Sequence, residues 1–204
     1  MKFSISASNV VPDQWRNFVL QYCEEQQARG VQFKDGETIG VGWMVFKLKS
    51  ETDHFIIQAP KLGSMPMVFD DDCSNALQVA MTQKYMAESF GCPLTACNCL
   101  QSAIILKNLS REDGIFMNRQ ETEQGNDSGW FIGAQNSKLD PNDPKNLERK
   151  SLWEISRLFP ETIEFWQLQV NWQVVFEPRP IVLCSFQKSR PVPRSYYATK
   201  YGLY

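Results

Sequence analysis

The densest group of polar side chains lies between positions 118 and 128, in the stretch NRQETEQGNDS. Three carboxylates, Glu121, Glu123 and Asp127, follow Arg119 there, and apolar residues flank the stretch on both sides. Paired carboxylates perform acid–base chemistry when they face each other across an apolar cleft. Carboxylates that share one polar loop do not indicate that geometry. The stretch therefore reads as a recognition loop or as a solvated hairpin connection.

Other catalytic or metal chemistry would rest on few residues. His54 is the single histidine, so a nucleophile–histidine arrangement would have to use it as the base. Cys92, Cys97 and Cys99 form a cluster, but zinc needs four ligands and the fourth would be distant in sequence. Glycine-rich nucleotide and phosphate motifs are missing. We predict no catalytic residue, metal or cofactor, and keep as an alternative an enzyme of unfamiliar type that uses His54 or the cysteines.

The end of the chain is basic. No acidic residue follows Glu177, whereas five cations do: Arg179, Lys188, Arg190, Arg194 and Lys200. Four tyrosines accompany them: Tyr196, Tyr197, Tyr201 and Tyr204. Cations and aromatic rings together can hold nucleic acid bases, so a nucleic-acid-binding regulatory module is a second alternative. The net charge of −2 opposes it, and we do not expect nucleic acid to be the main partner.

Hydropathy and cysteine use indicate the compartment. No apolar run approaches the roughly 18 residues that span a bilayer. The N-terminal MKFSISASNVVPDQW becomes polar too early for a secretory signal. Six cysteines in such a chain read as reduced thiols. We therefore expect a cytoplasmic protein with no membrane partner.

Periodicity predicts an α+β fold of two small domains, each a helix with an antiparallel or mixed sheet. In the first half, Trp15, Phe18, Val19, Tyr22 and Cys23 have helical spacing. VGWMVFKLK and HFIIQAP then predict a hairpin, and CSNALQVAMTQKYMAESF predicts a second helix. Gly91 and Pro93 mark the domain boundary. The expected parts are a domain over 1–92, a domain over 100–185, and an extended basic tail over 186–204.

The second half contains several apolar runs that predict strands. These are SAIILK, GIFMNR, SGWFIGAQ, EFWQLQV, WQVVFE and PIVLCSF. Trp130 and Ile132 alternate onto one face of their strand. Ser151 and Glu154 predict a capping box for a helix in SLWEISRLF, which Pro160 ends.

The segment GIFMNRQETEQGNDSGWFIGAQ resembles the signature of the immunity protein thirty-three domain family of bacterial polymorphic toxin systems. The matching pieces are IFMNR, the polar connection with a glutamate, and NDSGWFIGAQ, followed by the helix and proline of LWEISRLFPETIEFW. The resemblance covers residues from about 100 to 180. The first ninety residues do not carry the signature, so the role of the N-terminal domain stays unassigned.

The resemblance implies a bacterial immunity protein that binds and neutralises a cognate toxin by protein–protein interaction, rather than an enzyme. It marks Arg119, Glu121, Asp127, Ser128, Gly129 and Trp130 as motif positions. The predicted partner-binding residues are Arg119, Glu121, Glu123, Asp127, Ser128 and Trp130. If the toxin has a basic cleft, the three carboxylates would occupy its anion site and speed association.

Overall fold

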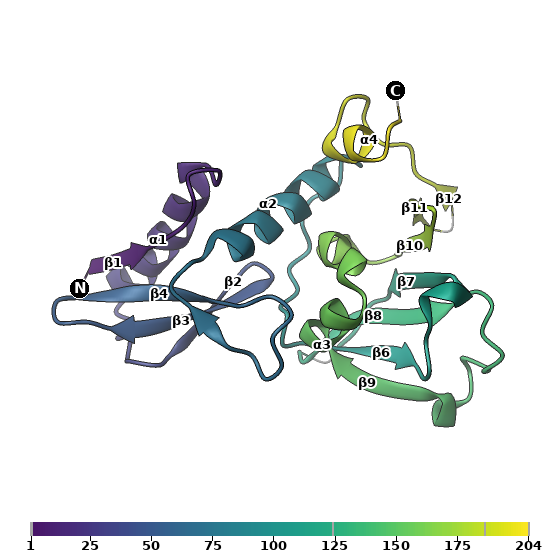
Figure 1. The fold of residues 1–204 in the computed structure, drawn as a ribbon, viewed down its shortest axis with the longest axis horizontal. Coiled ribbons are helices and arrows are strands. Elements are labelled where there is room, and N and C mark those ends of the chain that lie inside the picture. Colours follow the sequence, from purple (N-terminus) through teal and green to yellow (C-terminus); the bar gives the residue numbers. More distant parts are fainter. Residues whose placement is uncertain (1, 124, 186, 204) are drawn as a thin grey trace. The chain divides into compact units, whose positions relative to one another are not determined.

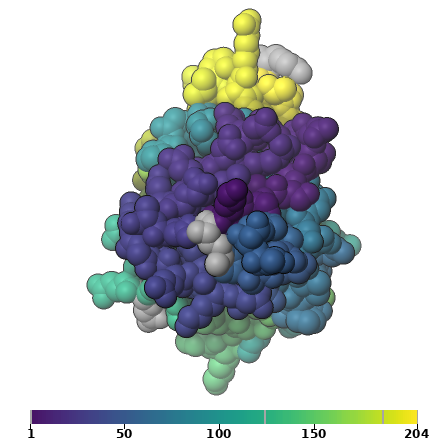
Figure 2. Space-filling view, turned by 90° about the vertical axis from the view of Figure 1, so that its left-hand side faces the viewer, coloured from purple at the N-terminus to yellow at the C-terminus, as the bar shows by residue number. Residues whose placement is uncertain are grey.

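The computed structural model describes residues 2–123, 125–185 and 187–203 (Figure 1). The chain divides into two compact units, with the boundary in the sequence between Thr82 and Gln83. Each unit contains helices and a mixed sheet, so the predicted α+β class is confirmed. The first unit, coloured purple to blue, faces the viewer in Figure 2. None of the helices in the described residues is long and apolar enough to cross a membrane.

The sheet of the first unit has the strand order β1-β4-β3-β2, and β5 also pairs with β4. Its strands are β1 (Lys2–Ile5), β2 (Thr38–Val41), β3 (Met44–Ser50), β4 (His54–Pro60) and β5 (Phe69–Asp70). Strands β3 and β4 pair antiparallel and confirm the predicted hairpin. Strand β1 pairs with β4 in parallel, and no local sequence pattern predicts this pairing.

Helix α1 (Asp13–Ala28) confirms the first predicted helix but buries a narrower face than predicted. Trp15, Val19 and Cys23, spaced by four residues, are buried. Phe18 is 56% exposed, which corrects its assignment to the core face. Each residue turns the helix by about 100°, so Phe18 points well away from the stripe that contains Val19.

Helix α2 (Ser74–Glu88) confirms the second predicted helix and begins in the first unit and ends in the second. Asp72 accepts hydrogen bonds from the Ser74 backbone N–H at 2.9 Å and from the Ser74 hydroxyl. These bonds lower the pKa of the Asp72 carboxyl. Asp72 therefore lies just before the helix, at the end where the helix dipole favours a negative charge.

The sheet of the second unit has the order β12-β11-β10-β7-β8-β6-β9. Its strands are β6 (Ser102–Leu106), β7 (Ile115–Arg119), β8 (Asp127–Ala134), β9 (Leu147–Ser151), β10 (Trp172–Glu177), β11 (Arg179–Cys184) and β12 (Gln187–Lys188). Strands β7 and β8 form an antiparallel hairpin, and β8 pairs on its other side with β6, in parallel. The strands predicted in SAIILK, GIFMNR, SGWFIGAQ and WQVVFE are confirmed. Strand β11 begins one residue before the run PIVLCSF and follows it as far as Cys184, and Phe186 lies outside the described residues.

One predicted strand of the second unit is absent, and a strand of the structure was not predicted. The run EFWQLQV contains no strand, because Pro160–Phe165 forms the 3-10 helix η3 and the chain then turns to bury Trp166 completely. Strand β9 was not predicted, because its sequence LERKS lacks the apolar pattern of a strand. Helix α3 (Leu152–Leu158) follows it, and the predicted capping box of Ser151 and Glu154 is present.

The C-terminal segment was predicted to be extended over 186–204. It contains instead the short helix α4 (Tyr196–Lys200). Ser195 caps it by accepting from the Ala198 backbone N–H at 3.4 Å. The Tyr197 N–H donates to the Ser89 hydroxyl at 3.0 Å, and the Tyr197 ring lies 4.8 Å from that of Phe90. Tertiary contacts therefore support this helix, although Pro191 and Pro193 come shortly before it. Tyr204 lies outside the described residues.

Candidate functional site

The polar stretch forms the connection of the β7–β8 hairpin. Its base is closed by the Gln120 N–H, which donates to the Gly129 carbonyl at 2.9 Å. Asp127 accepts from the Gly129 N–H at 2.9 Å, so its side chain closes a local turn at the start of β8. Gly129 has φ +75°, and a Cβ atom at this position would stand 2.1 Å from the Gln120 carbonyl oxygen. Only glycine lets the two chain segments approach so closely.

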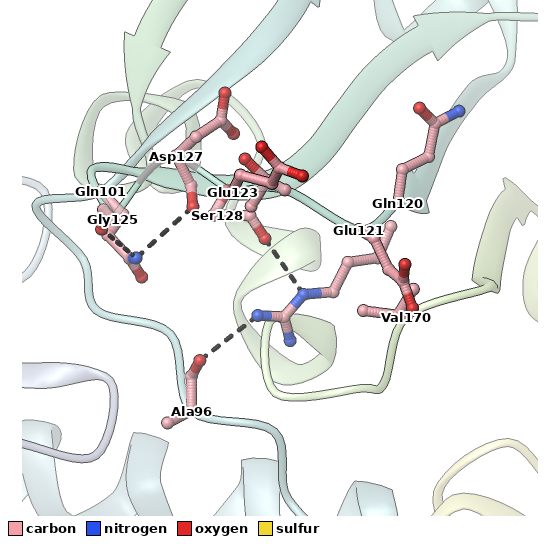
Figure 3. A pocket seen from close by; sticks show the side chains of 11 residues that line it. Ala96, Gln101, Gln120, Glu121, Glu123, Gly125, Asp127, Ser128 and Val170 are labelled. Atoms are coloured by element: carbon pink, nitrogen blue, oxygen red, sulfur yellow. Dashed lines mark hydrogen bonds between the residues drawn. The ribbon is translucent and has the colours of Figure 1, made fainter.

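The loop lines a pocket of about 560 Å³ in the second unit (Figure 3). Its lining is mostly polar and comes from four chain segments: Ala96 and Gln101, Arg119–Glu123, Gly125 with Asp127 and Ser128, and Val170. The pocket lies where the end of β7, the start of β8 and the chain before β6 meet. It therefore contains most of the residues that the sequence singled out.

Arg119 is a buried cation in the lining of the pocket, with 6% of its surface exposed. Its Nε donates to the Ser128 carbonyl at 3.1 Å, and its Nη atoms donate to the carbonyls of residues 95, 96, 166 and 168 at 2.7–3.4 Å. Burial lowers the pKa of the guanidinium. No carboxylate within the described residues forms an ion pair with it. The charge is therefore held by backbone dipoles, and this side chain joins three chain segments.

The three predicted carboxylates differ in their surroundings. Glu121 and Glu123 are exposed and form no ion pair with any residue that the structure describes. The Asp127 side chain is 15% exposed and pairs with Arg149 at 3.1 Å. Its other oxygen already accepts from Gly129. Two of the three carboxylates are thus available to a partner, whereas Asp127 is used within the fold.

Ser128 and Trp130 are buried and face the interior of the domain. The Ser128 hydroxyl donates to the Ser102 carbonyl at 2.8 Å. The Trp130 indole N–H donates to the Trp166 carbonyl at 3.0 Å, and the two indole rings lie 5.6 Å apart. These two side chains position β8 and the loop that precedes it.

Comparison with known proteins gives a family match for the segment that carries this site. Residues 82–182 match the family model of the Imm33-like domain. Residues 82–182 are therefore similar to an Imm33-like domain. No curated protein and no solved structure matches the chain. Every residue of the pocket falls inside the matched segment.

Three residues of the matched segment contribute to the site but were not predicted. The Gln101 amide donates to the Gly125 carbonyl at 2.9 Å and accepts from the Asn98 N–H at 2.9 Å. Ala96 lines the pocket and accepts from Arg119. Arg149 pairs with Asp127 across β6, because β9 is a neighbour of that strand. These partners are far apart in sequence, so only the sheet order reveals them.

The residues of the enzyme alternative lie elsewhere. His54 belongs to the first unit, and its Nδ1 lies 2.9 Å from the Asp53 carboxylate. In the matched segment, the Cys97 thiol donates to the Trp166 carbonyl at 3.0 Å and the Cys92 thiol to the Ala87 carbonyl at 3.4 Å. Burial raises the pKa of Cys97 to about 12 and that of Cys92 to about 11. Within the described ranges, no group of three or more potential ligands is placed to hold a metal.

Proposed function

We propose that this protein is a bacterial, cytoplasmic immunity protein that binds a cognate toxin and neutralises it by direct contact, without catalysing a reaction. The observation that carries the proposal is the match of residues 82–182 to the Imm33-like domain. The role of the first unit stays open, since it lies almost entirely outside the matched segment.

The character of the pocket supports recognition. Catalytic sites bring a base, a nucleophile or a perturbed acid together in one cleft. This pocket contains a guanidinium held by carbonyls and two exposed carboxylates. Such groups can form polar contacts with another protein.

The predicted partner-binding residues take two roles in this proposal. Glu121 and Glu123 contact the toxin. Arg119, Ser128 and Trp130 are buried and hold the loop in its binding conformation, and Asp127 does so through its pair with Arg149. A loop whose shape is fixed before binding loses less conformational entropy on association.

Co-expression with the product of the adjoining gene tests the proposal. We expect that product to arrest growth alone, and this protein to restore growth and to co-purify with it in stoichiometric amounts. A toxic neighbour that is neither bound nor neutralised would contradict the proposal for this pair. Purified protein should also be assayed for inhibition of the toxin in vitro, which separates neutralisation from reduced expression.

A further inference from the structure

Two large apolar side chains are exposed on the chain segment that forms one wall of the pocket. Leu94 is 47% exposed and Leu100 is 56% exposed. They belong to the short segment 94–101, called the connection below, which also contains Ala96 and Gln101 of the pocket lining. Exposed leucines close to a polar recognition loop are typical of a protein-binding surface, in which an apolar area is bordered by polar groups.

This connection and the loop are tied together by hydrogen bonds. Arg119 donates from the end of β7 to the carbonyls of Thr95 and Ala96, at 3.2 and 3.3 Å. Gln101 reaches the Gly125 carbonyl from the other end of the connection. The Ser102 N–H also donates to the Asn126 carbonyl at 2.8 Å. The leucines and the acidic loop are therefore parts of one preorganised surface.

The charge that a partner can reach on this surface is mainly negative, because the half-exposed Arg149 is paired with Asp127. Glu121 and Glu123 are exposed, and neither has an ion-pair partner among the described residues. Arg119 is buried and its N–H groups point at backbone carbonyls. A partner therefore meets two exposed carboxylates on the loop and two exposed leucines on the connection, whereas Arg119 stays inside.

We propose that the partner presents a lysine or arginine next to apolar side chains, with the cation placed against Glu121 and Glu123 and the apolar group against Leu94 and Leu100. This inference rests on the proposed function and specifies the toxin face that the domain recognises. Phosphate groups do not fit, because the accessible charges would repel them. An apolar contact stabilises the complex by removing water, and the charges guide the approach and set the orientation.

Two pairs of variants of the full-length protein test the two halves of the surface separately, with affinity for the purified adjoining-gene product measured at several salt concentrations. For Glu121→Gln with Glu123→Gln we expect about tenfold weaker binding at low salt and a flatter salt dependence. For Leu94→Ser with Leu100→Ser we expect about tenfold weaker binding with the salt dependence of the wild type.

Matched controls are available in the same unit. Glu112→Gln changes another exposed carboxylate, and Leu158→Ser changes another leucine, which is 46% exposed. Both should bind like the wild type. Circular dichroism and thermal unfolding verify that all variants remain folded.

The outcomes separate this inference from the proposed function. Wild-type affinity in both test pairs, together with an intact neutralising complex, would overturn the composite surface and leave the immunity function in place. A loss confined to the glutamate pair would overturn the apolar half. No complex with wild-type protein would overturn the immunity proposal for this partner and the inference with it.

Discussion

At the scale of single residues, the central feature is the Arg119 guanidinium, whose hydrogen bonds within the described residues all go to carbonyl oxygens and which also lies over the Trp130 ring, 5.7 Å from its centroid. Replacing Arg119 by Met would leave carbonyls of three segments without donors in a buried place. We expect the free energy of unfolding to fall by about 3 kcal/mol. We expect Arg119→Lys to lower the free energy of unfolding by nearly as much. A single ammonium group cannot reach all the carbonyl oxygens that surround the planar guanidinium. Urea titrations measure both, and wild-type stability of the lysine variant would show that charge alone matters.

Gly129 is the second residue whose identity the structure requires. Gly129→Ala would force a side chain into positive φ and against the Gln120 carbonyl. We expect a loss of about 2–3 kcal/mol in the free energy of unfolding, visible as a lower urea midpoint. Gly125→Ala is the matched control, since nothing lies within 4 Å of its added Cβ atom. Equal midpoints for the two variants would show that the hairpin relaxes freely.

At the scale of elements, the start of α3 gives a pH-dependent prediction. The Ser151 side chain, and then its backbone N–H, lower the pKa of Glu154 below its ordinary value of 4.5. A lowered folded-state pKa adds stability that is present above pH 4.5 and is lost as pH falls through the folded pKa. Ser151→Ala should cost about 1 kcal/mol at pH 7 and less near pH 3. Unfolding curves at both pH values check this, and an equal cost at both would exclude the Glu154 linkage.

The elements also show what the sequence could and could not predict. Helices α1 and α2, the β3–β4 hairpin and the capping box follow from signals within a few residues, and all were predicted. The pairing of β1 with β4 and the position of β6 between β8 and β9 depend on which distant strands share a core. The loop at 118–128 was therefore found, whereas its contacts with Gln101, Ala96 and Arg149 were not. The helix at Tyr196–Lys200 was missed for the same reason, because its support comes from Ser89 and Phe90.

At the scale of the whole molecule, charge distribution gives a prediction about nucleic acid as a partner. Two of the five cations that follow Glu177 have partners within the fold. Lys200 pairs with Glu164, and Arg179 donates to the Tyr201 carbonyl at 3.2 Å. Tyr197 is 5% exposed and is not available to stack on a base. The exposed cations that remain are Lys188, Arg190 and Arg194, on a chain with a net charge of −2.

Three cations give few phosphate contacts, and their effect is screened beyond about 8 Å at physiological salt. We therefore expect no measurable binding of a labelled single-stranded DNA or RNA 20-mer in fluorescence anisotropy at 0.15 M salt, and weak binding at most at low salt. Arg190→Glu with Arg194→Glu supplies the comparison for any residual signal. Tight, salt-sensitive binding that this double variant abolishes would instead identify the C-terminal segment as a nucleic acid site, because only a cluster that acts together could overcome the negative charge of the rest of the chain.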